Sequence, residues 1–287
     1  MAKELGLFGR HGLEVDLVAM MSGSLAITAV VSGDAPIGHV GGTPVINASL
    51  AGADTVLIAG TEKTIYYQLV VSPTIVSAKD LKGKRVGVSR FGSFSDFVMR
   101  VGLEHLGLNP GGDVAILQTG STQNRLSLLR SGAISGTVIF PPETVAARKA
   151  GTRTLLDYLN LNVEVQGSGI TTSRRFLKEH KDVAVRFLRG FLEGIAAFKT
   201  RRDESLRVMN KYLRIDDREI LEEAYDYFAN KIIPQKPYPT LKGIEFVLRF
   251  LSEQDPRAGK AKPEQFVDMS LLKEIDNSGF IDRLYSK

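Results

Sequence analysis

The sequence has no cysteine, no tryptophan and no long hydrophobic run. The lack of cysteine excludes disulfides, thiolate metal sites and cysteine nucleophiles. A membrane-spanning helix needs about 18 or more consecutive apolar residues, and every apolar run here is shorter. The first residues, MAKELGLFGRHG, show no apolar signal-peptide region. These absences leave the cellular compartment open.

Concentrated positive charge is also scarce. The formal net charge is +5, and the densest basic cluster is KDLKGKR at Lys79–Arg85. Proteins that bind nucleic acid usually present a basic stripe with aromatic residues among it. A short mixed cluster of this kind is typical of a solvated turn before a strand, so we expect no nucleic-acid partner.

Glycine, by contrast, is abundant, with 28 residues in a chain of 287. Average usage is about 7%, so many tight loops are expected. The length allows one large domain or two of medium size. The hydrophobic and charged fractions, 43% and 24%, are ordinary for a globular protein.

Up to about Leu161 the sequence repeats one unit, in which a β-rich run ends in small residues and a helical pattern follows. This alternation predicts parallel sheets covered by helices. Five of the predicted helices close on a glycine suited to a left-handed cap, namely Gly33, Gly52, Gly107, Gly132 and Gly151. The β-rich runs that begin the five units are LEVDLVAM, APIGHV, KRVGVS, VAILQT and GTVIF.

Two other β-rich segments interrupt the repeat, at Tyr66–Val71 and Val163–Ser173. We interpret them as an outgoing and a return crossing between two lobes. The predicted first lobe is discontinuous, residues 1–73 with 172–287, and the second lobe is inserted at residues 74–171. From Arg174 onward the pattern is helical, and the apolar face around Phe187 and Phe191 is interpreted as core packing.

In an open α/β sheet, ligands bind beyond the carboxyl ends of the strands, where helix N-termini present unpaired N–H groups. The loops at those positions are rich in glycine and hydroxyl residues: MSGS, VGGT, GTEKT, RFGSFS, TGST and FPPE. Serine and threonine are also ordinary helix N-caps, so each loop alone is weak support for a ligand site. The set is stronger, because two groups of loops would face each other across a cleft.

The sequence matches none of the nucleotide-binding or catalytic motifs that we considered. In VGVSRFGSFSDF, Gly87 and Gly92 have the spacing of a P-loop, but Ser93 and Phe94 replace its lysine and hydroxyl residue. We find no dinucleotide glycine fingerprint, no G-x-S-x-G elbow and no grouping of nucleophile, base and orienting residue. We therefore expect no catalytic residue, no metal ligand and no cofactor.

The segments AKELGLFGRHGLEVDLV, SGSLAITAVVSGDAPIGHVGGTPVINASLAGAD, DLKGKRVGVSRFGSFSDF and LLRSGAISGTVIFPPE resemble the periplasmic solute-binding proteins of ABC importers. The similarity is to the branch that binds nitrate, sulfonates, taurine and thiamine precursors, and it covers Ala2 to about Arg201. It implies an α/β, type II periplasmic-binding fold with two lobes, two crossings, a helical C-terminal tail and closure around a ligand.

The resemblance also implies ligand contacts in the loops beyond the strands and near the return crossing. We add Arg125 to the expected ligand contacts because of its place in the chain. It lies in the first turn of a predicted helix, where a cation is either solvated or paired with an anion. Tyr66 and Tyr67 either stack on a ligand or pack in the hinge. The expected ligand-binding residues are Ser22, Gly23, Ser24, Gly42, Thr43, Phe91, Gly92, Ser93, Ser95, Gly120, Ser121, Arg125, Gly167, Ser168 and Gly169.

The function implied is a monomeric, periplasmic or cell-surface binding protein that delivers a small, anionic solute to an ABC permease and its ATPase. The alternative is an enzyme on the same fold, related to thiamine-pyrimidine synthases or dehydratases. The fungal synthases carry a cysteine-rich motif that is absent here. A ligand-sensing regulator would need a DNA-binding segment, and we find none.

Relatives of this kind begin with a signal peptide and a first strand, whereas this sequence starts in the helix that follows. We expect two strands with unpaired edges as a result. A chain that carries the upstream strand is expected to melt at a higher temperature.

Overall fold

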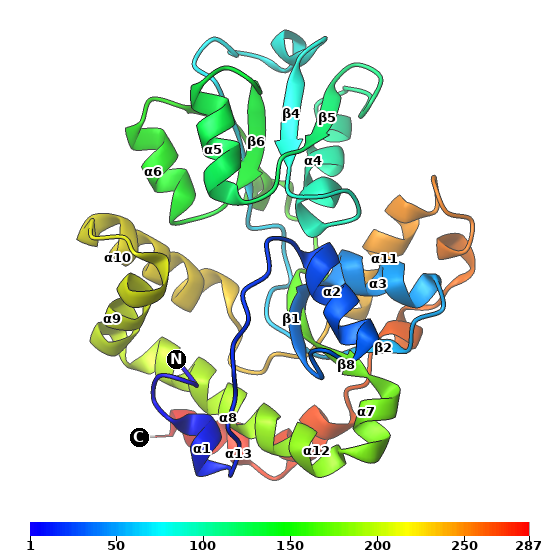
Figure 1. The fold of residues 1–287 in the computed structure, drawn as a ribbon, viewed down its shortest axis with the longest axis vertical. Helices are drawn as coiled ribbons and strands as arrows, with labels where there is room; N and C mark the ends of the chain where they lie inside the picture. The colour runs from blue at the N-terminus through cyan, green and yellow to red at the C-terminus, as the bar shows by residue number, and fades with distance from the viewer. Residues whose placement is uncertain (287) are drawn as a thin grey trace.

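The computed structural model describes residues 1–286 and contains two β-sheets, each with helices beside it (Figure 1). One sheet has three strands in the order β1-β8-β2, and the other has five in the order β5-β4-β6-β3-β7. We call the three-stranded sheet with its helices the first lobe and the five-stranded sheet with its helices the second lobe. The strands are β1 (Gly38–Gly41), β2 (Thr55–Gly60), β3 (Gln68–Val71), β4 (Arg85–Val88), β5 (Ala115–Gln118), β6 (Gly136–Ile139), β7 (Arg153–Asp157) and β8 (Ser168–Ser173).

The sheet of the first lobe is antiparallel and that of the second lobe is mixed, which corrects the expectation of parallel sheets. In the second lobe β4 runs parallel to β5 and β6, as repeated βα units require, but β3 is antiparallel to β6 and β7. In the first lobe β8 is antiparallel to both β1 and β2. The antiparallel strands β3 and β8 are the ones that enter each sheet from a crossing, so they arrive from the opposite end. The α/β class is confirmed.

The helices follow the expected alternation and continue as a helical tail after β8. Glycines at positive φ close several of them as predicted, for example Gly33 after α2 at φ +85° and Gly132 after α5 at +75°. A short π-helix at Phe228–Ile232 continues α10. The α-helices are α1 (Leu7–Arg10), α2 (Gly23–Ser32), α3 (Gly42–Leu50), α4 (Phe94–His105), α5 (Thr122–Arg130), α6 (Glu143–Lys149), α7 (Arg174–Glu179), α8 (Lys181–Thr200), α9 (Arg202–Leu213), α10 (Arg218–Tyr227), α11 (Leu241–Leu251), α12 (Ser270–Asn277) and α13 (Phe280–Tyr285).

One predicted strand does not form. The run LEVDLVAM is irregular, and the side chains of Leu17 and Val18 are exposed. A β-rich segment becomes a strand only where another strand supplies its backbone hydrogen bonds, and within residues 1–286 no strand pairs with this run. The sequence reading also missed β7, which pairs with β3 at the edge of the second sheet.

The two crossings lie side by side. The backbone N–H of Val165 donates to the carbonyl of Lys63 at 3.1 Å, and that of Gly167 donates to the carbonyl of Glu62 at 3.0 Å. An isolated antiparallel bridge joins Thr64 and Glu164. The segments predicted as crossings, Tyr66–Val71 and Val163–Ser173, consist mostly of strands β3 and β8. We propose residues 61–67 and 158–167 as the connection between the lobes, because β3 and β8 belong to the sheets on either side. The division into 1–73 with 172–287 and 74–171 stays a prediction.

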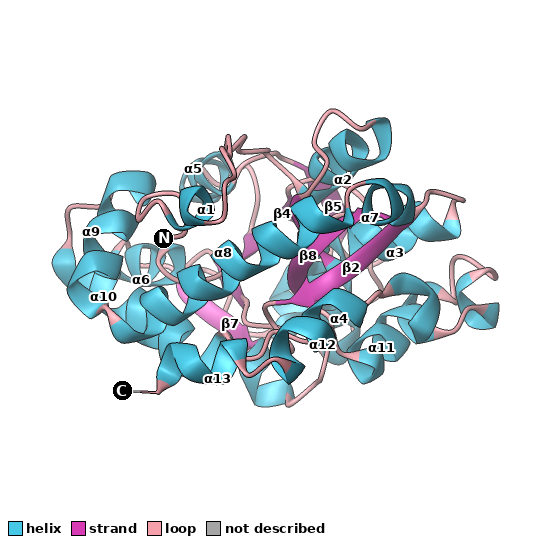
Figure 2. Ribbon diagram, turned by 90° about the horizontal axis from the view of Figure 1, so that it is seen from below, coloured by secondary structure: helices cyan, strands magenta, loops and turns pink. Residues whose placement is uncertain are grey.

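The long helix α8 covers the first lobe's sheet, as Figure 2 shows. Leu188 and Leu192 of this helix are buried against Val56 and Ile58 of β2 and Ile170 of β8. The apolar face predicted in the tail is therefore core packing, as expected. Among residues 1–286, no helix combines the length and apolar composition that a membrane crossing requires.

Candidate ligand-binding site

The predicted loops of the two lobes lie in contact. The hydroxyl of Ser24, in the first turn of α2, donates to the carbonyl of Phe91, before α4, at 3.2 Å. A Cβ added to Gly41, before α3, would lie 2.9 Å from the Cβ of Phe94. Three helix N-termini, two from the first lobe and one from the second, therefore meet at one place. We call this meeting point, with the crossing residues next to it, the inter-lobe site.

Glycines allow the return crossing to approach this site closely. The N–H of Gly42 donates to the carbonyl of Gly167 at 2.6 Å. A Cβ at Gly167 would lie 2.8 Å from the Cβ of Glu62, and one at Gly169 would lie 2.3 Å from the carbonyl oxygen of Ala59. Gly167 and Gly169 are thus required by the packing of backbone against backbone. Ser168 and Gly169 belong to β8.

In the loop before α4, predicted site residues bond mainly to one another. Ser93 and Ser95 are buried and lie 3.0 Å apart between their hydroxyl oxygens, and each oxygen lies 2.9 Å from the hydroxyl of Ser89. Ser93 also caps α4 by accepting from the N–H of Asp96. Gly92 adopts φ +73°, and its N–H donates to the Asp96 carboxylate at 2.9 Å.

Two other predicted hydroxyl residues serve as helix caps. Ser22 accepts from the N–H of Leu25 at the start of α2, and Ser121 accepts from the N–H of Asn124 at the start of α5. Gly120 adopts φ +73°. Gly23 packs tightly beside α3, since a Cβ there would lie 3.0 Å from the Pro44 ring. Phe91 is 47% exposed, and its N–H donates to Gln118.

Arg125 departs from an ordinary solvated arginine, because it is only 4% exposed. Its guanidinium donates to the carbonyl of Val138 at 2.8 Å and to the hydroxyl of Thr122 at 2.8 Å. Its Nε is buried without a hydrogen-bond partner. Within the described residues, no carboxylate oxygen lies within 4.0 Å of it. Burial lowers the pKa of this guanidinium, while Tyr67 and Glu143 act in the opposite direction.

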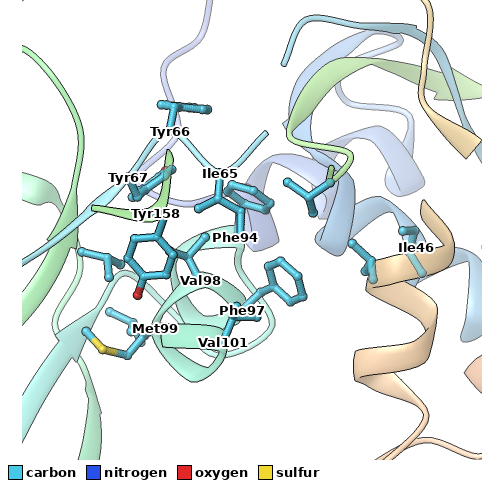
Figure 3. Packing of buried hydrophobic residues seen from close by; sticks show 14 of the residues in the cluster. Ile46, Ile65, Tyr66, Tyr67, Phe94, Phe97, Val98, Met99, Val101 and Tyr158 are labelled. Atoms are coloured by element: carbon cyan, nitrogen blue, oxygen red, sulfur yellow. The ribbon is translucent and has the colours of Figure 1, made fainter. Parts of the chain in front are cut away.

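Aromatic rings from the second lobe and the helical tail surround the first crossing. The Tyr67 ring lies 4.9 Å from that of Phe140, after β6, and 5.7 Å from that of Phe94, at the start of α4. The Tyr66 ring lies 5.6 Å from that of Phe228 in the helical tail. Figure 3 shows Tyr66 and Tyr67 on the crossing, with Phe94 close by on α4. These rings bring the crossing, the second lobe and the tail together.

Two carboxyl groups near these rings, Glu62 and Glu143, are not among the site residues predicted from the sequence. Glu62 is 5% exposed and accepts from the N–H of Ser168 at 2.5 Å. Glu143 begins α6, burial raises its pKa, and its Oε2 is buried without a partner. Both lie in loops at the ends of predicted strands, GTEKT and FPPE. A single acidic residue among small or apolar residues was the sequence feature that could have marked each one as a candidate site residue. The buried hydroxyl of Thr43, a predicted site residue, also lacks a partner.

Tyr67 lies within the electrostatic influence of all three charged groups. Its pKa is raised mainly by burial, Arg125 acts to lower it, and Glu62 and Glu143 raise it further. In the described chain, no group of three or more histidine or acidic side chains is placed to hold a metal ion. The arrangement offers hydrogen-bond donors, one buried cation and buried acids around aromatic rings, which suits binding of a small polar molecule.

Two α/β lobes, two adjacent crossings and helix N-termini at the junction define the periplasmic-binding-protein class of fold. A family model described as NMT1/THI5 like matches residues 1–205. The match covers more than half of the chain, and the chain belongs to this family.

Two curated relatives are similar in sequence. The "Taurine-binding periplasmic protein" of Escherichia coli (strain K12) is 30% identical over 142 residues, which is 49% of this chain and 43% of that protein. The "Putative aliphatic sulfonates-binding protein" of Bacillus subtilis (strain 168) is 24% identical over 296 aligned positions, 100% of this chain and 82% of that protein. The first match thus spans less than half of the relative's own length.

A solved structure supports the fold. The alkanesulfonate-binding protein SsuA from Xanthomonas axonopodis pv. citri, bound to MOPS, superposes with a TM-score of 0.76 and 18% sequence identity. The superposition covers 95% of this chain and 91% of that chain. The predicted two-lobe architecture is confirmed at the level of the fold.

Proposed function

We propose that this protein is the solute-binding component of an ABC importer and that it binds an organosulfonate at the inter-lobe site. Membership of the family and the names of the two relatives support the transport role. The contact between loops of both lobes, seen at Ser24 and Phe91, supports a ligand held between the lobes. Closure around a ligand by a hinge is the usual behaviour of such two-lobed proteins.

The buried guanidinium of Arg125 is the observation that carries the proposal. A buried charge without a counterion is costly, and the nearby helix N-termini add further positive potential. An anion with several oxygens would offset both, because it can accept from a guanidinium and from several N–H or hydroxyl groups. A sulfonate has three such oxygens on one atom.

The remaining parts of the proposal follow from the transport role. The protein would act outside the cytoplasm, in the periplasm or at the cell surface, as a monomer, and would deliver its solute to a membrane permease with an ATPase. A binding role has more support than a catalytic one, because both relatives are named as binding proteins. The predicted site hydroxyls also mainly cap helices or bond to one another.

Titration calorimetry with methanesulfonate, ethanesulfonate, nitrate, acetate and a neutral pyrimidine tests the proposal. We expect at least one sulfonate to bind more tightly than acetate and the pyrimidine. Arg125→Gln should weaken sulfonate binding about tenfold or more, the scale of a lost charge-assisted contact. Arg130→Gln is the matched control, because Arg130 is exposed on the same helix. Melting curves show whether each variant is folded.

Tight binding of the neutral pyrimidine together with failure of every anion would overturn the proposal. So would equal effects of the two arginine substitutions in folded protein.

A further inference from the structure

Glu62 is a buried acid without a cation beside it. Its side chain is 5% exposed, yet in the described chain no lysine, arginine or histidine nitrogen lies within 4.0 Å of its carboxylate. The Oε2 accepts from the N–H of Ser168 at 2.5 Å, and no hydrogen bond reaches Oε1 from the described residues. One N–H satisfies only part of an ionised carboxylate, which can accept about four hydrogen bonds.

The hydrogen bonds between the two crossings do not require the negative charge of Glu62. The backbone of Glu62 already accepts from the N–H of Gly167 at 3.0 Å, and a neutral amide oxygen could also accept from the N–H of Ser168. In the folded protein alone the carboxylate therefore has one N–H donor and no cation as partner. A ligand that brings a cation would supply the missing partner.

The opposite situation holds at Arg125. Arg125 is a buried cation without a carboxylate partner, and Glu62 is a buried anion without a cation partner. Both affect the pKa of Tyr67, in opposite directions, but they form no ion pair with each other. A molecule with an anionic end and a cationic end would pair with both.

The surroundings of Glu62 suit an alkylammonium group. The Tyr66 ring lies 5.0 Å from that of Tyr67, 5.2 Å from that of Phe140 and 5.6 Å from that of Phe228. Burial and then the charge of Glu62 raise the pKa of Tyr66, which fits a carboxylate near this ring cluster. Aromatic faces attract ammonium groups, and the attraction grows when water is excluded.

Resting on the proposed function, we propose that Glu62 is a specificity-determining residue of the inter-lobe site, whose carboxylate binds the ammonium group of a zwitterionic aminosulfonate. The sulfonate end of the same ligand is bound beside Arg125 and the helix N-termini. The site then selects aminosulfonates over sulfonates of the same size that lack the amine.

Calorimetry with taurine (2-aminoethanesulfonate) and isethionate (2-hydroxyethanesulfonate) tests this selection, because the two differ only in amine against hydroxyl. Wild-type protein should bind taurine about tenfold or more tightly than isethionate, the scale of one charge-assisted hydrogen bond. Glu62→Gln keeps an oxygen for the N–H of Ser168 but removes the charge. It should weaken taurine binding about tenfold or more and leave isethionate binding nearly unchanged.

Glu179→Gln is the control, since it removes a charge from an exposed side chain on α7, outside the inter-lobe site. It should leave the ratio of taurine to isethionate affinity unchanged.

Equal binding of the two ligands by wild-type protein overturns the inference and leaves the proposed function standing. Equal weakening of both ligands by Glu62→Gln also overturns it, since that is the result of a purely structural role. If wild-type protein binds neither these ligands nor the simple sulfonates, the proposed function itself fails. The wild-type comparison decides the question even if the variant does not fold.

Discussion

The ammonium group of Lys149 lies 2.9 Å from the carboxylate of Asp217, and this ion pair joins α6 of the second lobe to the helical tail (Figure 1). Lys149 also lies 2.8 Å from Glu219, and its neighbour Arg148 lies 3.1 Å from Glu223. The bond from Lys149 lowers the pKa of Asp217, and the bonds from Asp217 and Glu219 raise the pKa of Lys149. These exposed pairs favour the arrangement in which the lobes are in contact.

Reversal of charge at Lys149 should therefore favour separation of the lobes. Lys149→Glu replaces two attractions with two repulsions, and we expect ligand affinity to fall about two- to tenfold, because exposed pairs are individually weak. The loss should shrink at high salt, where exposed charges are screened. Calorimetry at low and high salt and small-angle scattering without ligand measure both effects. Lys178→Glu, on α7, makes the same charge change away from the ion pairs and should have little effect.

Gly92 and Ser93 should differ in their effect on ligand binding. Gly92 adopts φ +73°, where a β-branched side chain is strained, so Gly92→Val should displace the loop before α4. Ser93→Ala removes the cap of α4, which typically costs about 1 kcal/mol, but leaves the backbone donors in place. Calorimetry should show a larger loss of affinity for Gly92→Val. A larger loss for Ser93→Ala in folded protein would contradict this reading of the loop.

The partly buried acid Glu143 should make stability depend on pH. Burial raises its pKa above the usual 4.5, so the folded protein keeps a proton that the unfolded chain releases as the pH rises past that value. Stability is then lost with increasing pH until Glu143 ionises in the folded state as well. In Glu143→Gln no group ionises at this position, so this pH dependence of stability is lost. The difference in melting temperature, variant minus wild type, should be more positive at pH 7.5 than at pH 4. A difference independent of pH would refute the raised pKa of Glu143.

Gly102 allows Tyr158 to pack against α4. A Cβ at Gly102 would lie 1.9 Å from the hydroxyl oxygen of Tyr158, a fully buried residue whose ring lies beside Val98 and Met99 (Figure 3). Gly102→Ala should cost about 1–3 kcal/mol through overpacking. Gly9→Ala, in α1 with open space around it, should be neutral or stabilising by up to about 1 kcal/mol. Denaturant unfolding of the two variants gives the comparison.

The sequence by itself determined the alternation of elements. Apolar runs, glycine at helix ends and serine at helix starts act over a few residues, so β4, α4 and their junction at Ser93 were predictable. The same local signals predicted β-rich segments at Tyr66–Val71 and Val163–Ser173, which contain β3 and β8, and the loops at the ends of the strands. They also predicted a strand at LEVDLVAM that does not form, because a strand depends on a pairing partner as well as on its own residues.

Only the tertiary structure decided which charges are buried. Arg125 and Glu62 stand in loops and first turns, where the sequence pattern is equally typical of solvated side chains. Arg125 is buried against the carbonyl of Val138 and Glu62 against the N–H of Ser168, so each charge meets a segment that is distant in the chain. Local preferences decide where a helix begins, whereas the dielectric surroundings of a charge depend on every segment packed around it.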